Sequence, residues 1–179
     1  IRNLQVDGTK VDFAGLFGRV GEAGSIFNLR LEDCQVGAWG SCVGMLAGYN
    51  GGTVRRCHAT GSATGGSSIG GLVGWNAGAV HQCSVTSKHL LSGNVLADFY
   101  VGGLVGSNYG EVRECYVLGA VLGFDGVGLL AGVNGGTITC SYVIGDVKGC
   151  QGVGRLVGRI AGNVAGMGRC YAVAGITGD

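Results

Sequence analysis

The stretch GGLVGWNAGAVHQCSVTS, from Gly70 to Ser87, decides the fold of this protein. Taken alone, it is open to interpretation as a glycine-rich phosphate-binding loop, with His81 and Cys83 as candidate metal ligands or nucleophiles. The alternative is that it is one unit of a scaffold. The two interpretations are separated by whether the stretch is unique, because a functional site is normally built once and a scaffold many times.

The stretch is not unique. Hexamers of the IGGLVG type occur six times, each with leucine at the fourth position, and they begin at Phe13, Val43, Ile69, Val101, Val127 and Val153. Three of the intervals between consecutive copies are equal, whereas the first and the third intervals are longer. The chain is therefore built from a repeat of about 26 residues with two enlarged copies.

The second half of each repeat alternates as a β-strand does. In the segments TVRRCHATG from Thr53, AVHQCSVTS from Ala79 and EVRECYVLG from Glu111, apolar or small residues alternate with the cysteine. This period of two predicts a strand with one buried face. Equivalent residues form two columns through the repeats, the asparagines Asn50, Asn76, Asn108 and Asn134 and the cysteines Cys57, Cys83, Cys115 and Cys170.

Short strands and glycine turns in a repeat of this length predict an all-β fold, a right-handed parallel β-helix (β-solenoid) of six to seven coils. Of the 179 residues 40 are glycine, and proline is absent, as expected where every strand pairs on both sides and needs its N–H. We expect residues 1–179 to be a single solenoid segment of a longer chain, because the first coil begins midway and neither end has a polar cap.

The sequences GGLVGWNAGAVHQCSV and VGGLVGSNYGEVRECYVLG resemble the GLUG motif, whose pattern is approximately GGLVG.N.G.I..CYATG. This motif is found in tandem in bacterial surface proteins, haemagglutinin-like adhesins and the non-catalytic part of some immunoglobulin A peptidases. The resemblance runs from about Phe13 onward and is weakest in the first copy, with Val20 and Leu29, and in the last, with Ile160. It implies an extracellular or cell-surface β-helix, and it carries no activity because the peptidase motif HExxH is absent.

Both columns are expected to be structural. Stacked coils place like residues over like, so the asparagine amides can bond along the stack. Leu29 and Ser141 occupy the cysteine column in other copies, which favours a row of small buried side chains over a thiolate or metal cluster. No metal site and no cofactor are expected, since no CxxC pair occurs. The pairing state stays open for the four cysteines outside the column, Cys34, Cys42, Cys140 and Cys150.

The charge of the chain does not favour binding to a nucleic acid or to a membrane surface. The formal net charge is +1, and no polybasic run occurs. The uncharged window 126–145 contains Asn134, two threonines and a serine, so we predict no transmembrane segment. A weakly basic stripe for anionic glycans is one interpretation of a further column, although a solvated polar face is favoured. That column contains Arg55, His81 and Arg113, with Arg56, Gln82 and Glu114 beside it.

The sequence of the hexamer does not decide which of its residues face the interior. Valine recurs at the first and fifth positions, as at Val101 and Val105, whereas Arg155 at the third position indicates that these odd positions face outward. Two arrangements remain. Either a bulge at the glycine pair switches the faces, or one outer face of the solenoid is apolar and covered by something else.

The sequence favours a non-enzymatic structural or adhesive module, a stalk or binding scaffold, of a surface or extracellular protein. Expected partners are a glycan or a host or surface protein, together with adjoining domains of the same chain or a second copy at the ends. The alternative is a glycan-active or receptor-binding β-helix, such as a polysaccharide lyase or a phage spike. Clustered carboxylates would favour that alternative, but Asp33, Asp98, Asp125 and Asp146 fall at scattered positions.

The two enlarged copies predict where a ligand would bind. In both, the extra residues lie between the second strand and the next hexamer, so both insertions emerge at the same corner of the stack. Loops held by a rigid scaffold are where binding usually resides. The candidate ligand-binding residues are Trp39 in the first insertion and Lys88, His89, Asp98 and Tyr100 in the second.

Overall fold

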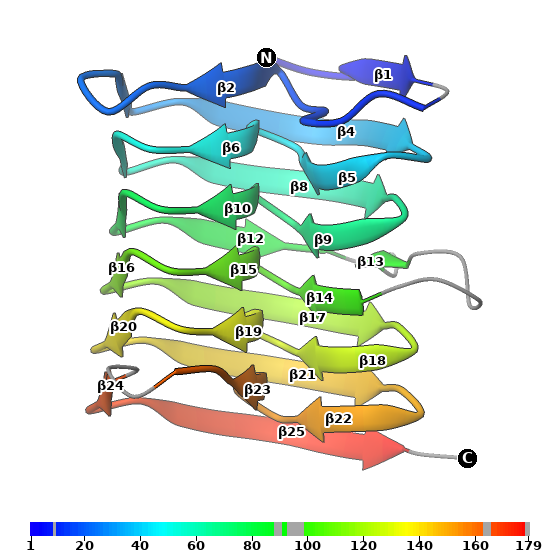
Figure 1. The fold of residues 1–179 in the computed structure, drawn as a ribbon, viewed down its shortest axis with the longest axis vertical. Coiled ribbons are helices and arrows are strands. Elements are labelled where there is room, and N and C mark those ends of the chain that lie inside the picture. Colours follow the sequence, from blue (N-terminus) through cyan, green and yellow to red (C-terminus); the bar gives the residue numbers. More distant parts are fainter. Residues whose placement is uncertain (9, 88–90, 93–98, 163–165, 178–179) are drawn as a thin grey trace.

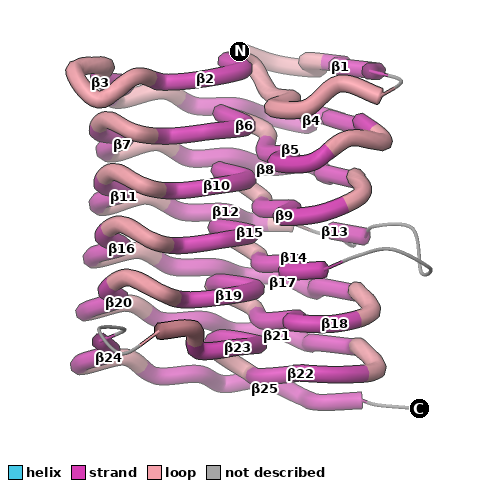
Figure 2. The backbone as a smooth tube through the Cα atoms, in the orientation of Figure 1, coloured by secondary structure: helices cyan, strands magenta, loops and turns pink. Residues whose placement is uncertain are grey.

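The computed structural model describes the whole chain except residues 9, 88–90, 93–98, 163–165 and 178–179. The described residues form a stack of coils, with the N-terminus at one end and the C-terminus at the other (Figure 1). Every regular element in this part of the chain is a β-strand (Figure 2). Four parallel sheets run along the stack.

The rear sheet, which is the most distant in Figure 1, contains the longest strands. The strands of this sheet are Gln5–Gly8 (β1), Arg30–Ala38 (β4), His58–Thr64 (β8), Ser84–Thr86 (β12), Tyr116–Leu122 (β17), Tyr142–Lys148 (β21) and Tyr171–Thr177 (β25), with Leu91–Ser92 (β13) paired to β17. The left-edge sheet contains Ser25–Phe27 (β3), Thr53–Arg55 (β7), Ala79–His81 (β11), Glu111–Arg113 (β16), Thr137–Thr139 (β20) and Gly166–Gly168 (β24).

Two sheets share the front of the stack. The left front sheet contains Phe17–Val20 (β2), Ala47–Asn50 (β6), Val73–Asn76 (β10), Val105–Asn108 (β15), Ala131–Asn134 (β19) and Val157–Ile160 (β23). The right front sheet contains Ser41–Gly44 (β5), Ser67–Gly70 (β9), Phe99–Gly102 (β14), Asp125–Gly128 (β18) and Gln151–Gly154 (β22).

One full coil takes a strand from each sheet, as β5, β6, β7 and β8 do. Val80 in β11 lies opposite Val54 of the preceding coil and Val112 of the following one, so like residues stack on like. As the chain descends in Figure 1, the front strands run to the left and the rear strands to the right, which is a right-handed coil. The prediction of a right-handed parallel β-solenoid with about 26 residues per turn is confirmed, with about six turns.

The hexamer is divided between the two front sheets. In the third copy, β9 ends at Gly70 and β10 begins at Val73, and the bend between them lets Ile69, Leu72 and Val73 all reach the interior. The expectation that odd positions face outward is therefore wrong. Met45 and Leu129, at the third position, are also buried.

Arg155 suggested an outward orientation for the odd hexamer positions because of its own place in the stack. It lies in the last coil of the stack, which has a neighbouring coil on one side only, and its side chain is exposed there. Since the hexamer valines are buried, these positions do not form the apolar outer face that was the second arrangement considered. The interior is instead filled by rows of aliphatic side chains, including the leucines Leu46, Leu72, Leu104 and Leu130.

Two hexamer glycines are required by close contacts. A Cβ on Gly70 would lie 1.9 Å from the carbonyl oxygen of Val73, across the bend. A Cβ on Gly106 would lie 2.4 Å from the carbonyl carbon of Ser68 in the preceding coil. The first glycine permits the tight bend, and the second permits the close approach of consecutive coils.

Candidate functional site

The asparagine column forms a continuous ladder inside the stack. Asn50 Nδ2 donates to Asn76 Oδ1 at 2.8 Å, Asn76 Nδ2 to Asn108 Oδ1 at 2.8 Å, and Asn108 Nδ2 to Asn134 Oδ1 at 2.7 Å. Each Nδ2 also donates to the carbonyl two residues further on, as Asn50 does to Gly52 O at 3.3 Å. All four side chains are fully buried. Their amides hold neighbouring coils together and are closed to solvent.

The cysteine column also forms hydrogen bonds between neighbouring coils. The backbone N–H of Cys57 donates to Cys83 Sγ, and that of Cys83 donates to Cys115 Sγ, both at 3.4 Å. Ser141 takes the equivalent position in the next coil, where its Oγ accepts from Cys115 N at 3.1 Å. Cys170, half-buried, donates its thiol to Gly168 O at 3.3 Å.

Two thiols of this column, those of Cys57 and Cys83, are kept in their neutral form. The hydrogen bond from the neighbouring thiol, followed by burial, raises the pKa of Cys57, and the bond with Cys115 does the same for the pKa of Cys83. Burial raises the pKa of Cys42 to about 11. A thiol nucleophile or metal ligand reacts as the thiolate, so these environments disfavour both roles. The four cysteines outside the column are free thiols, buried at Cys34 and Cys42 and exposed at Cys140 and Cys150.

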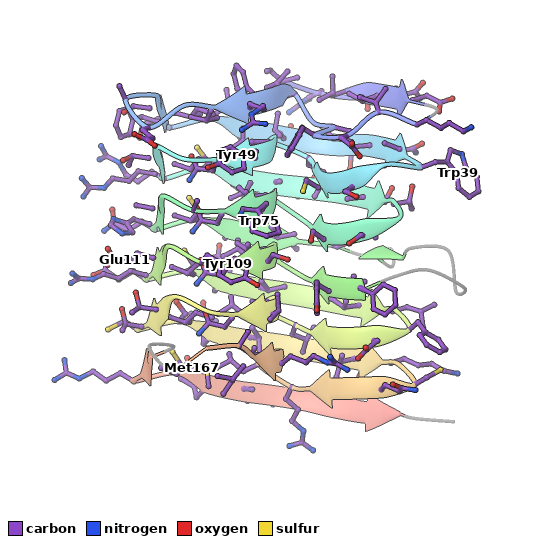
Figure 3. All side chains as sticks on the ribbon, viewed as in Figure 1. Trp39, Tyr49, Trp75, Tyr109, Glu111 and Met167 are labelled. Atoms are coloured by element: carbon purple, nitrogen blue, oxygen red, sulfur yellow. The ribbon has the colours of Figure 1, made fainter. Side chains whose placement is uncertain are left out.

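The predicted corner site is described only in part. Trp39 projects from the corner between β4 and β5 with 67% of its surface exposed (Figure 3). Tyr100 lies in β14, and its ring lies against Gly126 of the next coil. Lys88, His89 and Asp98 lie outside the described residues. A shared ligand for this set of side chains stays a prediction.

The candidate basic stripe is balanced by acids. Arg113 Nε donates to Glu114 Oε1 at 3.1 Å, and His81 Nε2 lies 3.3 Å from Glu111 Oε2. Gln82 bridges the coils, accepting from Arg55 Nε at 3.1 Å and donating to Glu114 Oε2 at 2.9 Å. The shallow pocket between these side chains therefore contains both signs of charge, as a solvated polar face does. Its exposed ion pairs contribute little stability.

Two outward aromatic clusters escaped the sequence analysis. Tyr49, Trp75 and Tyr109 lie on the left part of the front (Figure 3), and the Trp75 and Tyr109 rings stack at a centroid distance of 4.9 Å. On the rear sheet, the rings of Tyr116, Tyr142 and Tyr171 stack at 5.2 Å. The signal was present in the sequence, because the three rear tyrosines share one repeat position. A paired carboxylate and guanidinium, Asp125 and Arg159, was also missed.

In the part of the chain that the structure describes, no group of three or more His, Cys, Asp or Glu side chains is placed to hold a metal ion. Those same residues contain no helix long and apolar enough to cross a membrane.

Comparison with known families agrees with the repeat geometry. The model of the GLUG motif matches residues 65–88 and 97–122, which include the coils β9 to β12 and β14 to β17. These two coils are therefore similar to the GLUG motif. The same four-strand arrangement recurs in β5 to β8 and in β18 to β21, outside the matched residues. No solved structure matches the chain.

A curated protein is similar to part of the chain. Halomucin of Haloquadratum walsbyi (strain DSM 16790 / HBSQ001) is 40% identical over 65 residues. The match includes 36% of this chain and 1% of halomucin, so the chain corresponds to a very small part of that relative.

Proposed function

We propose that this chain is a non-enzymatic structural or adhesive module, a stalk or binding scaffold, of a surface or extracellular protein. The observation that carries the proposal is the use of its buried polar groups. The amides of the asparagine ladder and the thiols of the cysteine column bond to neighbouring coils, and each arrangement is repeated along the stack. Groups used in this way stabilise a rod and are not available for chemistry.

The comparisons support the same proposal. Two coils match the GLUG motif, which the resemblance noted from the sequence connects with bacterial surface proteins. The similarity to a small part of halomucin is compatible with a module within a much larger protein. A rod of stacked coils holds attached groups at a fixed distance from its base. The proposed partners are accordingly a glycan or another surface protein.

Surface exposure is tested in the cells that encode the chain. An antibody raised against this segment should label intact cells or the culture medium, because the proposed module lies outside the cell. An antibody against a cytosolic protein of the same cells is the matched control. Labelling that appears only after lysis would overturn the proposed location.

The absence of catalysis is tested separately. The full chain is incubated with neutral and acidic polysaccharides, and released fragments are measured by mass spectrometry. We expect no fragments above those of the heat-denatured chain. Fragments that Asp125→Asn abolishes would contradict the proposal and favour the glycan-active alternative.

A further inference from the structure

A hollow lies on the outer face of the rear sheet, over the strands β1, β4 and β8. Its volume is about 360 Å³, which falls within the range of about 300–1,000 Å³ that is typical of ligand sites. The outward residues that line it belong to two columns, Gln5, Gln35 and Ser62 in one and Asp7, Gly37 and Thr64 in the other. The hollow is thus a polar depression across three successive coils.

Gly37 leaves the middle of this hollow empty. Apart from its chain neighbours, Thr64 Oγ1 is the one described atom within 4 Å of a Cβ placed on Gly37, at 3.2 Å. Gly61, in the next coil of the same sheet, differs, because a Cβ there would lie 1.9 Å from the carbonyl oxygen of Cys34. Packing between coils therefore requires Gly61 but not Gly37. The space over Gly37 is open to a ligand.

The polar side chains around the hollow are not engaged within the protein. The five that belong to the two columns form no hydrogen bond or ion pair with another described residue. The stripe on the left edge differs in this respect, since Gln82 accepts from Arg55 and donates to Glu114. The donors and acceptors of the hollow are consequently available to a ligand, whereas those of the stripe bond to one another.

The lining of the hollow defines the chemistry that it can bind. It combines the carboxylate of Asp7 with two side-chain amides and two hydroxyls. The carboxylate only accepts hydrogen bonds, whereas the amides and hydroxyls both donate and accept. None of the described lining residues is cationic. A matching ligand has several hydroxyl groups and no negative charge.

An exposed aromatic side chain stands at one end of the hollow. Trp39 follows Gly37 by two residues, and its N–H continues the strand pairing by donating to Gly8 O at 3.3 Å. Two residues of extended strand span about 7 Å, so Trp39 lies at the rim. Its side chain projects from the corner with 67% of its surface exposed (Figure 3). Such a ring offers a flat apolar surface beside the polar lining.

We propose that the hollow and Trp39 together bind a neutral glycan. A sugar ring has hydroxyls along its edge and an apolar C–H face. One ring over Gly37 exchanges hydrogen bonds with Asp7 and the amides, and the next ring lies against Trp39. An anionic glycan is repelled by the Asp7 carboxylate. This inference rests on the adhesive role proposed above, and it names the ligand class and the residues of its site.

The test measures binding of the full chain to neutral tetrasaccharides, namely those of β-1,4-glucose, β-1,4-N-acetylglucosamine, α-1,4-glucose and α-1,6-mannose, by isothermal titration calorimetry. Polygalacturonate is the anionic comparison. We expect at least one neutral tetrasaccharide to bind. Gly37→Val fills the hollow and Trp39→Ala removes the apolar surface, so each should weaken that binding at least tenfold.

Both variants are expected to fold. Valine favours strands, and its Cβ at position 37 approaches only the tip of the Thr64 side chain among the described residues. We expect thermal midpoints within a few degrees of the wild type. Phe27→Ala, which removes a half-exposed ring from the left-edge sheet, is the matched control and should bind as the wild type does. If Gly37→Val does not fold, Trp39→Ala still decides the question.

Fluorescence provides a second measurement at the rim. The chain contains two tryptophans, so Trp75→Phe leaves only Trp39 to report. We expect the emission of this variant to shift when the tetrasaccharide binds. Trp39→Phe leaves only Trp75, which stacks on Tyr109 in the left front sheet, and its emission should stay unchanged.

Three results would overturn the inference. They are no binding of any neutral tetrasaccharide, binding that is unchanged in a folded Gly37→Val or Trp39→Ala variant, and polygalacturonate binding that is tighter than that of every neutral tetrasaccharide. Surface labelling of cells is independent of all three. The location proposed for the module therefore fails or stands separately from the ligand proposed for the hollow.

Discussion

The asparagine ladder and the Asp125–Arg159 pair use buried polar groups in opposite ways. In the ladder, Asn76 accepts from one coil and donates to the next, and the arrangement recurs from Asn50 to Asn134. In the pair, Asp125 has one oxygen bonded to Arg159 and one without a partner, and no other described coil repeats this pair. Repetition with full satisfaction is typical of the scaffold, whereas the Asp125–Arg159 pair is a local feature that the stacking of like on like does not produce.

The first prediction concerns the middle of the ladder. Asn108→Ala removes the acceptor of Asn76 and the donor to Asn134, and it leaves buried amide groups without partners. We expect the free energy of unfolding to fall by about 3 kcal/mol, as measured by urea denaturation. Asn134→Ala breaks one rung only and should cost about half as much. Equal losses at the two positions would show that the rungs do not act as a connected ladder.

The second prediction uses Cys42, which has a left-handed backbone just before the second hexamer, at the position that is Gly126 or Gly152 in later coils. Its pKa is raised from 9.0 to about 11, so the folded state favours the neutral thiol. Below about pH 9 both states are protonated, and above it the unfolded chain loses its proton first, so stability falls as the pH rises toward 11. Between pH 8 and pH 10, we expect a loss of up to about 1.4 kcal/mol from this thiol.

Cys42→Ser is the matched control for that pH dependence, because Ser68 occupies the equivalent position with a φ of 50°. The variant should lose less stability than the wild type between pH 8 and pH 10 in urea denaturation. Parallel curves for the two proteins would rule out a stabilising neutral thiol at Cys42.

The third prediction tests whether the cysteine column belongs with the ladder. Cys83→Ala removes the acceptor of the Cys57 N–H and a small buried side chain, so it should cost about 1 kcal/mol of unfolding free energy. Cys83→Ser should cost less, because Ser141 already performs this role for Cys115 with its hydroxyl. Any ligand binding should survive both changes. Loss of binding in a folded Cys83→Ala variant would place the column in a functional site.

The smallest effect is expected at the Asp125–Arg159 pair. Asp125→Asn should change the free energy of unfolding by less than about 1 kcal/mol, because one carboxylate oxygen has no partner and Arg159 is half-exposed. Differential scanning calorimetry at neutral pH measures the change. A loss comparable to that of Asn108→Ala would show that the pair stabilises the stack as the ladder does and remove the contrast between them.

The fold was predictable from the sequence because the residues that determine it recur from coil to coil. Columns such as Val54, Val80 and Val112 recur at the coil period, and in-register stacking turns that period directly into a parallel sheet. The division of the hexamer between two sheets was not predictable in the same way. An alternating pattern indicates which face of a single strand is buried, whereas Ile69, Leu72 and Val73 all reach the interior because the chain bends between two strands. Arg155 is exposed because it lies in the last coil of the stack.

The candidate site was less accessible to sequence analysis. Asp125 and Arg159 belong to different columns and different coils, so their contact depends on how the two front sheets meet. The balance of charge in the basic stripe also depended in part on stacking. Glu111 approaches His81 only once the coils are stacked, whereas Glu114 is the sequence neighbour of Arg113. Trp39 at the predicted corner is exposed, and the ligand role of the corner stays a prediction.

The asparagine ladder also gives the rod an electrical direction. Every side-chain amide from Asn50 to Asn108 points its Nδ2 toward the following coil, so the side-chain dipoles add along the axis as peptide dipoles do in a helix. Aligned bonds of this kind polarise one another. The C-terminal side of the ladder carries partial positive charge and the N-terminal side partial negative charge. Val20 and Ile160 occupy the column beyond each end and separate this dipole from whatever lies further along the axis.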